Sequence, residues 1–154
     1  MPTLYLDADA CPVKDEAYRV AGRYAVRTVV VANAHLRVPA GPLVELVVRP
    51  GFGAADDHIA EVAAPGDVVV TADIPLAARA LAKGARVLDP RGREITNDDI
   101  GAALGMRELM EELRARGEAT GGPPPLAAKD RSRFLSKLDE VLVAVKRAAG
   151  QRGS

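Results

Sequence analysis

The chain has few of the features that mark secreted, membrane or disulfide-bonded proteins. Its 154 residues include one cysteine, Cys11, so it can form neither an internal disulfide nor a cysteine-based zinc site by itself. No apolar run approaches the roughly 20 residues that a membrane span needs. The N-terminus begins with a strand-like pattern and has no basic region typical of a signal peptide. We therefore expect a cytoplasmic protein with no membrane partner.

Aromatic residues and net charge are also scarce. The formal net charge is zero, so no global field favours nucleic acid, although residues 107–154 carry a small basic excess and residues 1–106 a matching acidic one. The aromatic side chains are too few and too scattered to form an evident base-stacking platform. Phe52, within RPGFGAADD, is the one aromatic residue in an expected loop, and it remains a candidate.

What the chain does contain is an alternation of strand-like and helix-like segments. The apolar runs are nearly continuous, which is typical of strands covered on both faces. The strand-like runs are Thr3–Leu6, Arg27–Ala32, Val44–Val48, Asp67–Thr71 and Arg86–Leu88, and the helix-like segments between them are Val13–Tyr24, Ala55–Ala64 and Pro75–Lys83. This order predicts a three-layer α/β/α sandwich with a mostly parallel sheet of about five strands, plus C-terminal helices.

The C-terminal third has a different character. Ile100, Leu104, Leu109 and Leu113 recur at helical spacing, and TGGPPP then predicts a turn or linker. The last segment is an amphipathic helix expected to dock on the core or on a partner. We therefore predict an α/β domain over residues 1–116, a Gly/Pro-rich linker over 117–128 and a docked helix over 129–150.

Aspartates follow several of the predicted strands or begin the helices after them. Asp7 and Asp9 follow the first strand, Asp56 and Asp57 begin the second helix, and Asp73 follows the fourth strand. Because parallel strands end at one edge of a sheet, these carboxylates can converge. Clustered carboxylates stay ionised most readily around a cation, and their hard oxygen atoms suit Mg²⁺ or Mn²⁺. Such a metal supports hydrolysis of phosphate esters.

Most of these aspartates also have a purely structural interpretation. Asp73 precedes Ile74-Pro75 and is a good N-cap, and negative charge at Asp56 and Asp57 is favoured in a first helical turn. Asp7 is the exception, since it ends an apolar strand and we expect no helix immediately after it. The buried-looking Cys11 has no evident base nearby and is expected to be a packing residue.

Further candidates lie in the loops near the same edge. Asp89 and Asp98 are alternatives for an additional acid of the site. Four residues are predicted to bind substrate, the arginines as donors to phosphate oxygens: Arg49, Thr71, Arg91 and Arg93.

Several motifs resemble known families. TADIPLAARA, the aspartate of LYLDAD and the acids of ADDHIA resemble the three acidic motifs of the PIN-like superfamily of metal-dependent nucleases. The stretches DADACPVK, RPGFGAADDHIA, TADIPLA, DPRG followed by MRELMEELR, and TGGP resemble the YaiI/YqxD family of uncharacterised bacterial proteins over nearly the whole chain. The family resemblance brings no activity with it.

The superfamily resemblance implies a Mg²⁺- or Mn²⁺-dependent ribonuclease that binds RNA. The implied acids are Asp7, Asp73 and either Asp56 or Asp57, of which Asp57 is taken as the catalytic one; all of them would bind metal, with Asp9 as an added or substitute ligand. The superfamily's fourth acid has no secure counterpart, with Asp89 and Asp98 as the alternatives. The protein is also a candidate homo-oligomer.

Two other functions stay open. Asp7 and Asp9 could be the D-x-D pair of a haloacid-dehalogenase-type phosphatase, with Asp7 as nucleophile. Alternatively, the chain is a non-catalytic PIN-like module that binds RNA or a protein through its basic last helix, in which case the affinity for RNA depends on salt.

Overall fold

The computed structural model describes residues 2–115 and 125–152, apart from the side chains of residues 10, 107–115 and 151–152. Within this part, strands alternate with helices as the sequence predicts. The strands are β1 (Thr3–Asp7), β2 (Arg27–Ala32), β3 (Val44–Val48), β4 (Val68–Val70), β5 (Arg86–Leu88) and β6 (Glu94–Ile95). The helices are the short 3₁₀ turn η1 (Ala8–Ala10), α1 (Lys14–Arg23), α2 (Ala54–Val62), α3 (Ile74–Ala82), α4 (Asn97–Ala115) and α5 (Ala128–Arg152).

The strands form one mixed sheet in the order β3-β2-β1-β4-β5-β6. Every neighbouring pair is parallel except β5 and β6, which are antiparallel. The chain builds outward from β1 through β2 to β3, and then crosses to the other side of β1 to form β4. The direction of strand order therefore reverses between β1 and β4. In open α/β sheets, ligands bind outside the carboxyl ends of the strands at such a reversal.

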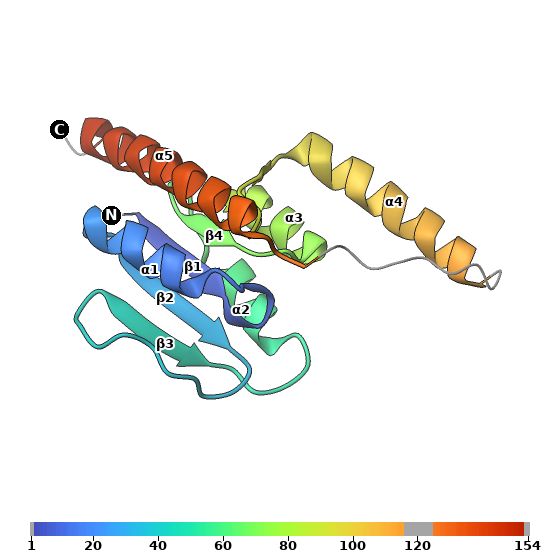
Figure 1. The fold of residues 1–154 in the computed structure, drawn as a ribbon, viewed down its shortest axis with the longest axis horizontal. Helices are drawn as coiled ribbons and strands as arrows, with labels where there is room; N and C mark the ends of the chain where they lie inside the picture. Colours follow the sequence, from blue (N-terminus) through green and yellow to red (C-terminus); the bar gives the residue numbers. More distant parts are fainter. Residues whose placement is uncertain (1, 116–124, 153–154) are drawn as a thin grey trace.

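Helices cover both faces of this sheet, which makes the fold a three-layer sandwich. On one face, α1 and α5 lie side by side (Figure 1), and the buried Phe134 and Leu138 of α5 share a core with Leu4 and Leu6 of β1. On the other face, α2 and α3 pack Ile59 and other apolar residues against the sheet. Because both faces are covered, the central strands β1, β2 and β4 are almost wholly buried, whereas the edge strand β3 is only partly buried.

The sheet has one more strand than the sequence predicts. β6 forms a hairpin with β5 around the Pro90-Arg91-Gly92 turn, which the main-chain N–H of Asp89 closes by donating to Arg93 O at 2.9 Å. Gly92 has a φ of 86°, and a Cβ atom there would lie 2.6 Å from the backbone of Phe134. The turn thus needs glycine both for its left-handed backbone and for the close approach of α5.

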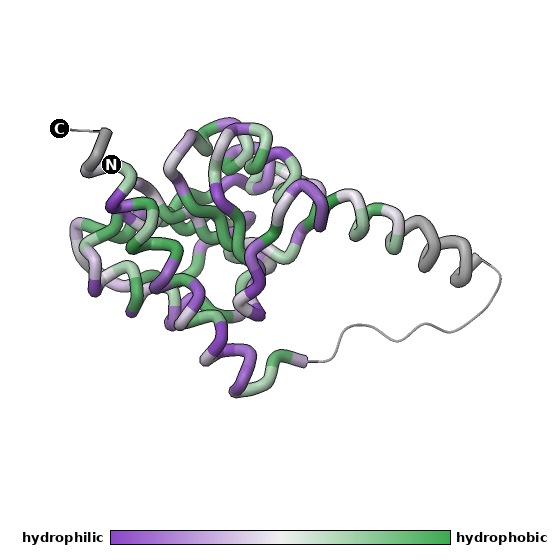
Figure 2. The backbone as a smooth tube through the Cα atoms, turned by 90° about the horizontal axis from the view of Figure 1, so that it is seen from above, coloured by the Kyte–Doolittle hydropathy of each residue, from purple (hydrophilic) through white to green (hydrophobic). Residues whose placement is uncertain are grey.

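The two C-terminal helices differ in how they meet the body. α5 is docked on the core along its apolar stripe, whereas α4 contacts α3 and then extends away from the body (Figures 1 and 2), with Leu104 and Met106 exposed. Most of the predicted linker over 117–128 lies outside the described residues, as do the side chains of Leu109 and Leu113.

Candidate functional site

The candidate site lies where the strand order reverses, at the carboxyl ends of β1 and β4. Asp7 is the last residue of β1, and its side chain is buried, with 2% of its surface exposed. Thr71 follows β4 and is also buried; its hydroxyl donates a hydrogen bond to Asp7 Oδ2 at 2.8 Å. Within the described part of the chain, no other hydrogen bond to the Asp7 carboxylate is observed. The other carboxylate oxygen of Asp7 is therefore left without a protein donor.

Contrary to the expectation from sequence, a short helical turn does follow Asp7. Asp7 occupies the N-cap position of η1, but its side chain makes no capping hydrogen bond. The carboxylate is thus not used to cap the turn, so helix capping does not explain Asp7. Asp9, within η1, is exposed and accepts the main-chain N–H of Asn33 at 3.2 Å, which ties η1 to the end of β2.

Helix starts position two further carboxylates. Asp73 is the N-cap of α3 and its Oδ1 accepts the main-chain N–H of Leu76 at 2.8 Å, as the structural interpretation of this residue predicts. The Thr71 hydroxyl also accepts the N–H of Asp73 at 3.0 Å, so a single threonine joins the loop of Asp73 to Asp7. Asp56 lies in the first turn of α2. Negative charge at both positions is favoured by the positive end of a helix dipole.

These carboxylates line one cavity of about 290 Å³, which we call the acid cavity. Its lining residues are Asp7, Asp9, Asn33, Phe52, Gly53, Ala55, Asp56 and Asp73. The structure therefore brings together four of the five predicted metal-binding aspartates, which come from separate segments of the chain. Sequence reasoning missed Asn33, although it follows β2 in the same way as Asp7 ends β1, and the convergence of strand ends could have identified it.

The electrostatics of the acid cavity are dominated by burial and by like charges. Burial raises the pKa of the Asp7 carboxyl to about 6; the Thr71 hydrogen bond opposes this rise, whereas the nearby Asp56, Asp73 and Asp9 add to it. Burial also raises the pKa of Asp56, and the Asp73, Asp57 and Asp9 carboxylates raise it further. Mutual repulsion of this kind is relieved by bound cations.

The donor set of the acid cavity fits a hydrated cation. Its carboxylate oxygens are the hard ligands that Mg²⁺ and Mn²⁺ prefer. Among the described residues, however, no group of three or more histidine, cysteine, aspartate or glutamate side chains is arranged closely enough to hold a metal alone. Mg²⁺ usually keeps several waters and binds one or two carboxylates together with substrate phosphates. Asp7, with its oxygen that lacks a protein donor, and its neighbours Asp9, Asp56 and Asp73 are the residues that would hold such an ion.

Asp57, predicted as a catalytic and metal-binding acid, lies elsewhere. Its side chain is largely exposed and pairs with Arg79 of α3 at 2.7 Å, outside the acid cavity. Adjacent residues on a helix point about 100° apart, so only one of Asp56 and Asp57 can face the sheet edge. The structure places Asp56 on the acid cavity and Asp57 outside it.

The four predicted substrate-binding residues lie in different environments. Thr71 is fully buried, so it orients Asp7 rather than contacting a substrate. Arg91 and Arg93 form ion pairs with Asp130 at 2.9 Å and Asp99 at 2.5 Å. Those contacts link the β5–β6 turn to α5 and α4. Arg49 is exposed just after β3, and its side chain bonds its neighbour's carbonyl, Val48 O, at 3.1 Å. Among the described residues, Arg49 is therefore the arginine of this set that forms no ion pair.

Neither alternative for the superfamily's fourth acid lines the acid cavity. Asp89 Oδ1 accepts the main-chain N–H groups of Arg91 and Arg93 at 2.9 and 3.0 Å, and so it shapes the β5–β6 turn. Asp98 is exposed near the start of α4. Asp9 is therefore the fourth carboxylate of the acid cavity, alongside Asp7, Asp56 and Asp73.

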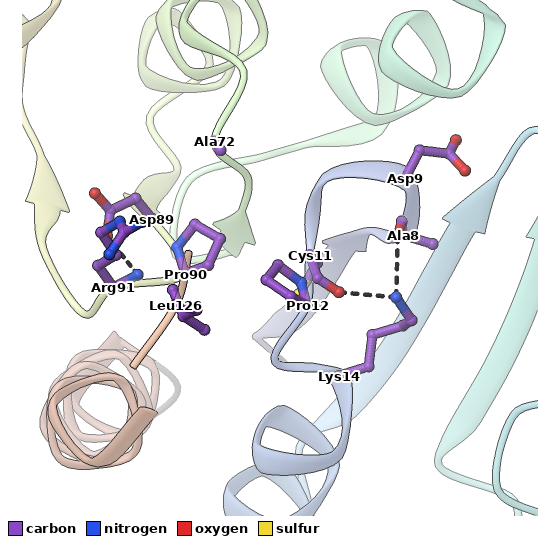
Figure 3. A pocket seen from close by; sticks show the side chains of 10 residues that line it. All are labelled: Ala8, Asp9, Cys11, Pro12, Lys14, Ala72, Asp89, Pro90, Arg91 and Leu126. Carbon is purple, nitrogen blue, oxygen red and sulfur yellow. Dashed lines mark hydrogen bonds between the residues drawn. The ribbon is translucent and has the colours of Figure 1, made fainter. Parts of the chain in front are cut away.

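A second cavity of about 410 Å³ adjoins the first, since Asp9 lines both. Figure 3 shows Cys11 and Pro12 on one side of it and Pro90 with Leu126 on the other. Lys14 Nζ donates to Ala8 O at 3.0 Å and to Cys11 O at 2.8 Å, which fixes the chain after η1. Burial raises the pKa of the Cys11 thiol to about 11. That thiol is therefore protonated near neutral pH and is no activated nucleophile.

Comparison with known proteins places this arrangement in a family. Residues 5–144 match the uncharacterised BCR, YaiI/YqxD family. The chain belongs to this family.

Bacterial members resemble the chain over nearly its full length. UPF0178 proteins of Paramagnetospirillum magneticum and Caulobacter vibrioides are 53% and 55% identical to it, over 96% of this chain and 98% and 97% of their own. A UPF0178 protein of Rhodospirillum centenum is 57% identical over 96% of this chain and 99% of its own. No solved structure matches the chain. Among the described residues, no helix is both long and apolar enough to cross a bilayer.

Proposed function

We propose that this protein is a Mg²⁺- or Mn²⁺-dependent ribonuclease of the cytoplasm that hydrolyses phosphodiester bonds at the acid cavity. The observation that carries the proposal is the convergence of Asp7, Asp9, Asp56 and Asp73 on one cavity at the point where the strand order reverses. Three of these positions also correspond to the acids of the PIN-like nucleases that the sequence resembles. A buried carboxylate among other carboxylates costs stability, so its presence calls for a functional explanation.

The residues of the cavity have distinct tasks in this proposal. Thr71 holds one oxygen of Asp7, so that the other faces the cavity. Asp73 is held by the start of α3 and Asp9 by the main chain of Asn33, which fixes the carboxylates before any ligand binds. A divalent cation bound there supplies an activated water and neutralises charge on the phosphate. Arg49 lies in the loop after β3 with N–H groups available for phosphate oxygens.

Cleavage of single-stranded RNA by purified protein tests the proposal directly. We expect cleavage with Mg²⁺ or Mn²⁺ and none with EDTA. The substitutions Asp7→Asn and Asp73→Asn should abolish it while the fold is retained, because asparagine can still accept the Thr71 hydrogen bond and is as good an N-cap as aspartate. Asp57→Asn is the matched control, since it removes a neighbouring carboxylate that pairs with Arg79 outside the cavity, and it should cleave normally.

Two outcomes would favour the other functions. Cleavage that persists in both Asp7→Asn and Asp73→Asn contradicts the proposal, and hydrolysis of p-nitrophenyl phosphate without cleavage of RNA favours a phosphatase. Binding of RNA through α5 has less support, because three basic side chains of this helix are engaged with the body. Arg131 pairs with Glu16 at 3.2 Å, Lys137 contacts Glu94 at 3.9 Å, and Lys146 donates to Tyr24 O at 2.5 Å.

A further inference from the structure

An aromatic side chain stands fully exposed at the rim of the acid cavity. Phe52 lines this cavity, yet its relative exposure is 108%, whereas the other exposed large apolar side chains lie between 37% and 53%. Leaving a phenylalanine ring in water forfeits roughly 1.5–3 kcal/mol of burial free energy. An exposed ring beside a polar cavity is therefore more informative than an exposed aliphatic side chain elsewhere on the surface.

Two glycines hold Phe52 in this position. Gly51 and Gly53 have φ angles of 113° and 72°, which side-chain-bearing residues rarely adopt. A Cβ atom at Gly53 would meet nothing within 4 Å, and one at Gly51 would only touch Ala54 Cβ at 3.8 Å. Lack of space for a side chain does not explain these glycines. Their positive φ angles explain them instead. The turn from β3 into α2 is thus shaped to present the residue between them at the carboxyl edge of the sheet.

The surroundings of Phe52 indicate what its ring contacts. Aromatic residues that anchor protein partners lie at the centre of apolar patches. Phe52 instead shares its cavity with the carboxylates of Asp7, Asp9 and Asp56 and with Asn33. Arg49, three residues earlier in the same loop, is exposed and uses one N–H of its guanidinium for Val48 O, while the group has five N–H donors. An aromatic face together with a cation is the usual combination for binding single-stranded nucleic acid.

We propose that Phe52 stacks on an unpaired nucleobase of single-stranded RNA, next to the phosphate that occupies the acid cavity. This inference rests on the proposed function and narrows its substrate to strands whose bases are free to leave a stack. Every base has a π-face, so stacking on Phe52 contributes affinity without demanding a particular sequence. A paired base in a duplex already stacks on its neighbours and offers no free face to the ring.

Equilibrium binding of a single-stranded RNA oligomer that carries one 2-aminopurine tests this proposal. With Ca²⁺ in place of Mg²⁺, we expect the wild-type protein to bind the oligomer and to quench its fluorescence by stacking. Phe52→Leu keeps an apolar side chain without a π-face, and it should weaken binding roughly 5- to 150-fold and remove the quenching. Phe52→Trp should retain both. Leu43→Ala is the matched control, since Leu43 is an exposed apolar residue that precedes β3, at the opposite edge of the sheet.

Each outcome decides the matter. Equal affinity of wild-type and Phe52→Leu protein overturns the inference, and so does a Phe52→Trp variant that binds as weakly as Phe52→Leu. Absence of saturable binding by the wild-type protein also overturns it. If sedimentation shows self-association that Phe52→Leu abolishes while RNA binding is unchanged, the ring is a protein contact instead. Stacking without cleavage contradicts only the nuclease, whereas cleavage with unchanged Phe52→Leu binding contradicts only the stacking.

Discussion

Two buried aspartates at opposite edges of the sheet show how differently one residue type can be used. Asp67 immediately precedes β4, and its two oxygens accept the main-chain N–H groups of Thr3 and Ala64, each at 3.0 Å. Asp7 ends β1 at the other edge, accepts one hydrogen bond from Thr71 and lies among other carboxylates. Burial raises the pKa of both groups, but the two N–H donors oppose this at Asp67, whereas neighbouring carboxylates add to it at Asp7.

The difference separates a structural carboxylate from a functional candidate. Asp67 links β1 to the α2–β4 turn, and each of its oxygens has a protein partner. Burial and neighbouring carboxylates disfavour the ionised form of Asp7, and a single hydrogen bond stabilises it. Folded proteins retain such a destabilised charge mainly at functional sites. Substitution of Asp67 should therefore lower the stability of the folded protein, whereas substitution of Asp7 should raise it.

The largest expected effect is a loss of stability at Asp67. Asp67→Ala leaves the buried N–H of Thr3 and the part-buried N–H of Ala64 without acceptors, and an unsatisfied buried donor costs roughly 1–3 kcal/mol. We expect the free energy of unfolding to fall by about 4 kcal/mol in urea denaturation at pH 7. Asp67→Asn keeps one acceptor oxygen and should lose less. An Asp67→Ala variant as stable as the wild type would show that the link between β1 and β4 is dispensable.

The next prediction concerns the pH dependence that Asp7 produces. Its pKa is about 6 in the folded protein against the ordinary 3.8, so the folded state binds this proton more tightly than the unfolded state. The stabilising contribution is therefore complete below about pH 3.8 and is lost as the pH rises through 6. A shift of this size corresponds to about 3 kcal/mol. Asp7→Asn should accordingly be more stable than the wild type at pH 8 without metal.

The pKa of Asp56 is also raised, so the stability of the wild type alone would depend on pH through both residues. The quantity to follow is therefore the difference in stability between Asp7→Asn and the wild type. The stability difference between Asp7→Asn and the wild type should grow between pH 4 and pH 7 and stay constant above that range. A difference that does not depend on pH would mean that Asp7 is not the group responsible.

Binding of a divalent metal ion should offset the loss of stability that the ionised carboxylates of the acid cavity cause. Mn²⁺ at 100 times its dissociation constant stabilises a protein that binds it only when folded by about 2.7 kcal/mol. We expect a corresponding rise in the melting temperature of the wild type and of Asp57→Asn. Asp7→Asn should respond weakly. Equal stabilisation of all three proteins would place the ion outside the acid cavity.

The smallest expected effect lies on the outer side of α2. Arg79 and Asp57 form an ion pair in which both side chains are at least half exposed, and such pairs contribute roughly 0–1 kcal/mol. Arg79→Ala should therefore change the free energy of unfolding by less than about 1 kcal/mol and leave RNA cleavage unaffected. A strong loss of cleavage in Arg79→Ala would instead indicate that Asp57 takes part in the reaction.

The sequence predicts most of this fold because the central strands are buried on both faces. Continuous apolar runs such as Arg27–Ala32 and Val44–Val48 coincide with β2 and β3, and the rule that parallel strands end together brings Asp7 and Asp73 to one edge. β6 escapes prediction because a strand of two residues shows no periodicity. The choice between Asp56 and Asp57 depends on how α2 is rotated against the sheet, which the packing decides and the local sequence does not.

The role of Thr71 could not be foreseen for a related reason. A threonine after a strand can face a ligand or a neighbouring side chain, and only its complete burial beside Asp7 distinguishes the two. The arginines of the β5–β6 turn were likewise ambiguous, since their acidic partners Asp99 and Asp130 lie on other elements, one of them 39 residues away from Arg91 in the chain.

The docking of α5 against α1 has a consequence for the order of events during synthesis. The core on that face joins Val20 of α1 to Leu138 and Leu142 of α5, so a nascent chain exposes the apolar side of α1 and β1 until more than a hundred further residues have left the ribosome. Contacts so distant in sequence form late and slowly. The core on this face is therefore completed only after α5 has been translated, and a chain truncated before α5 leaves the apolar side of α1 and β1 exposed to aggregation.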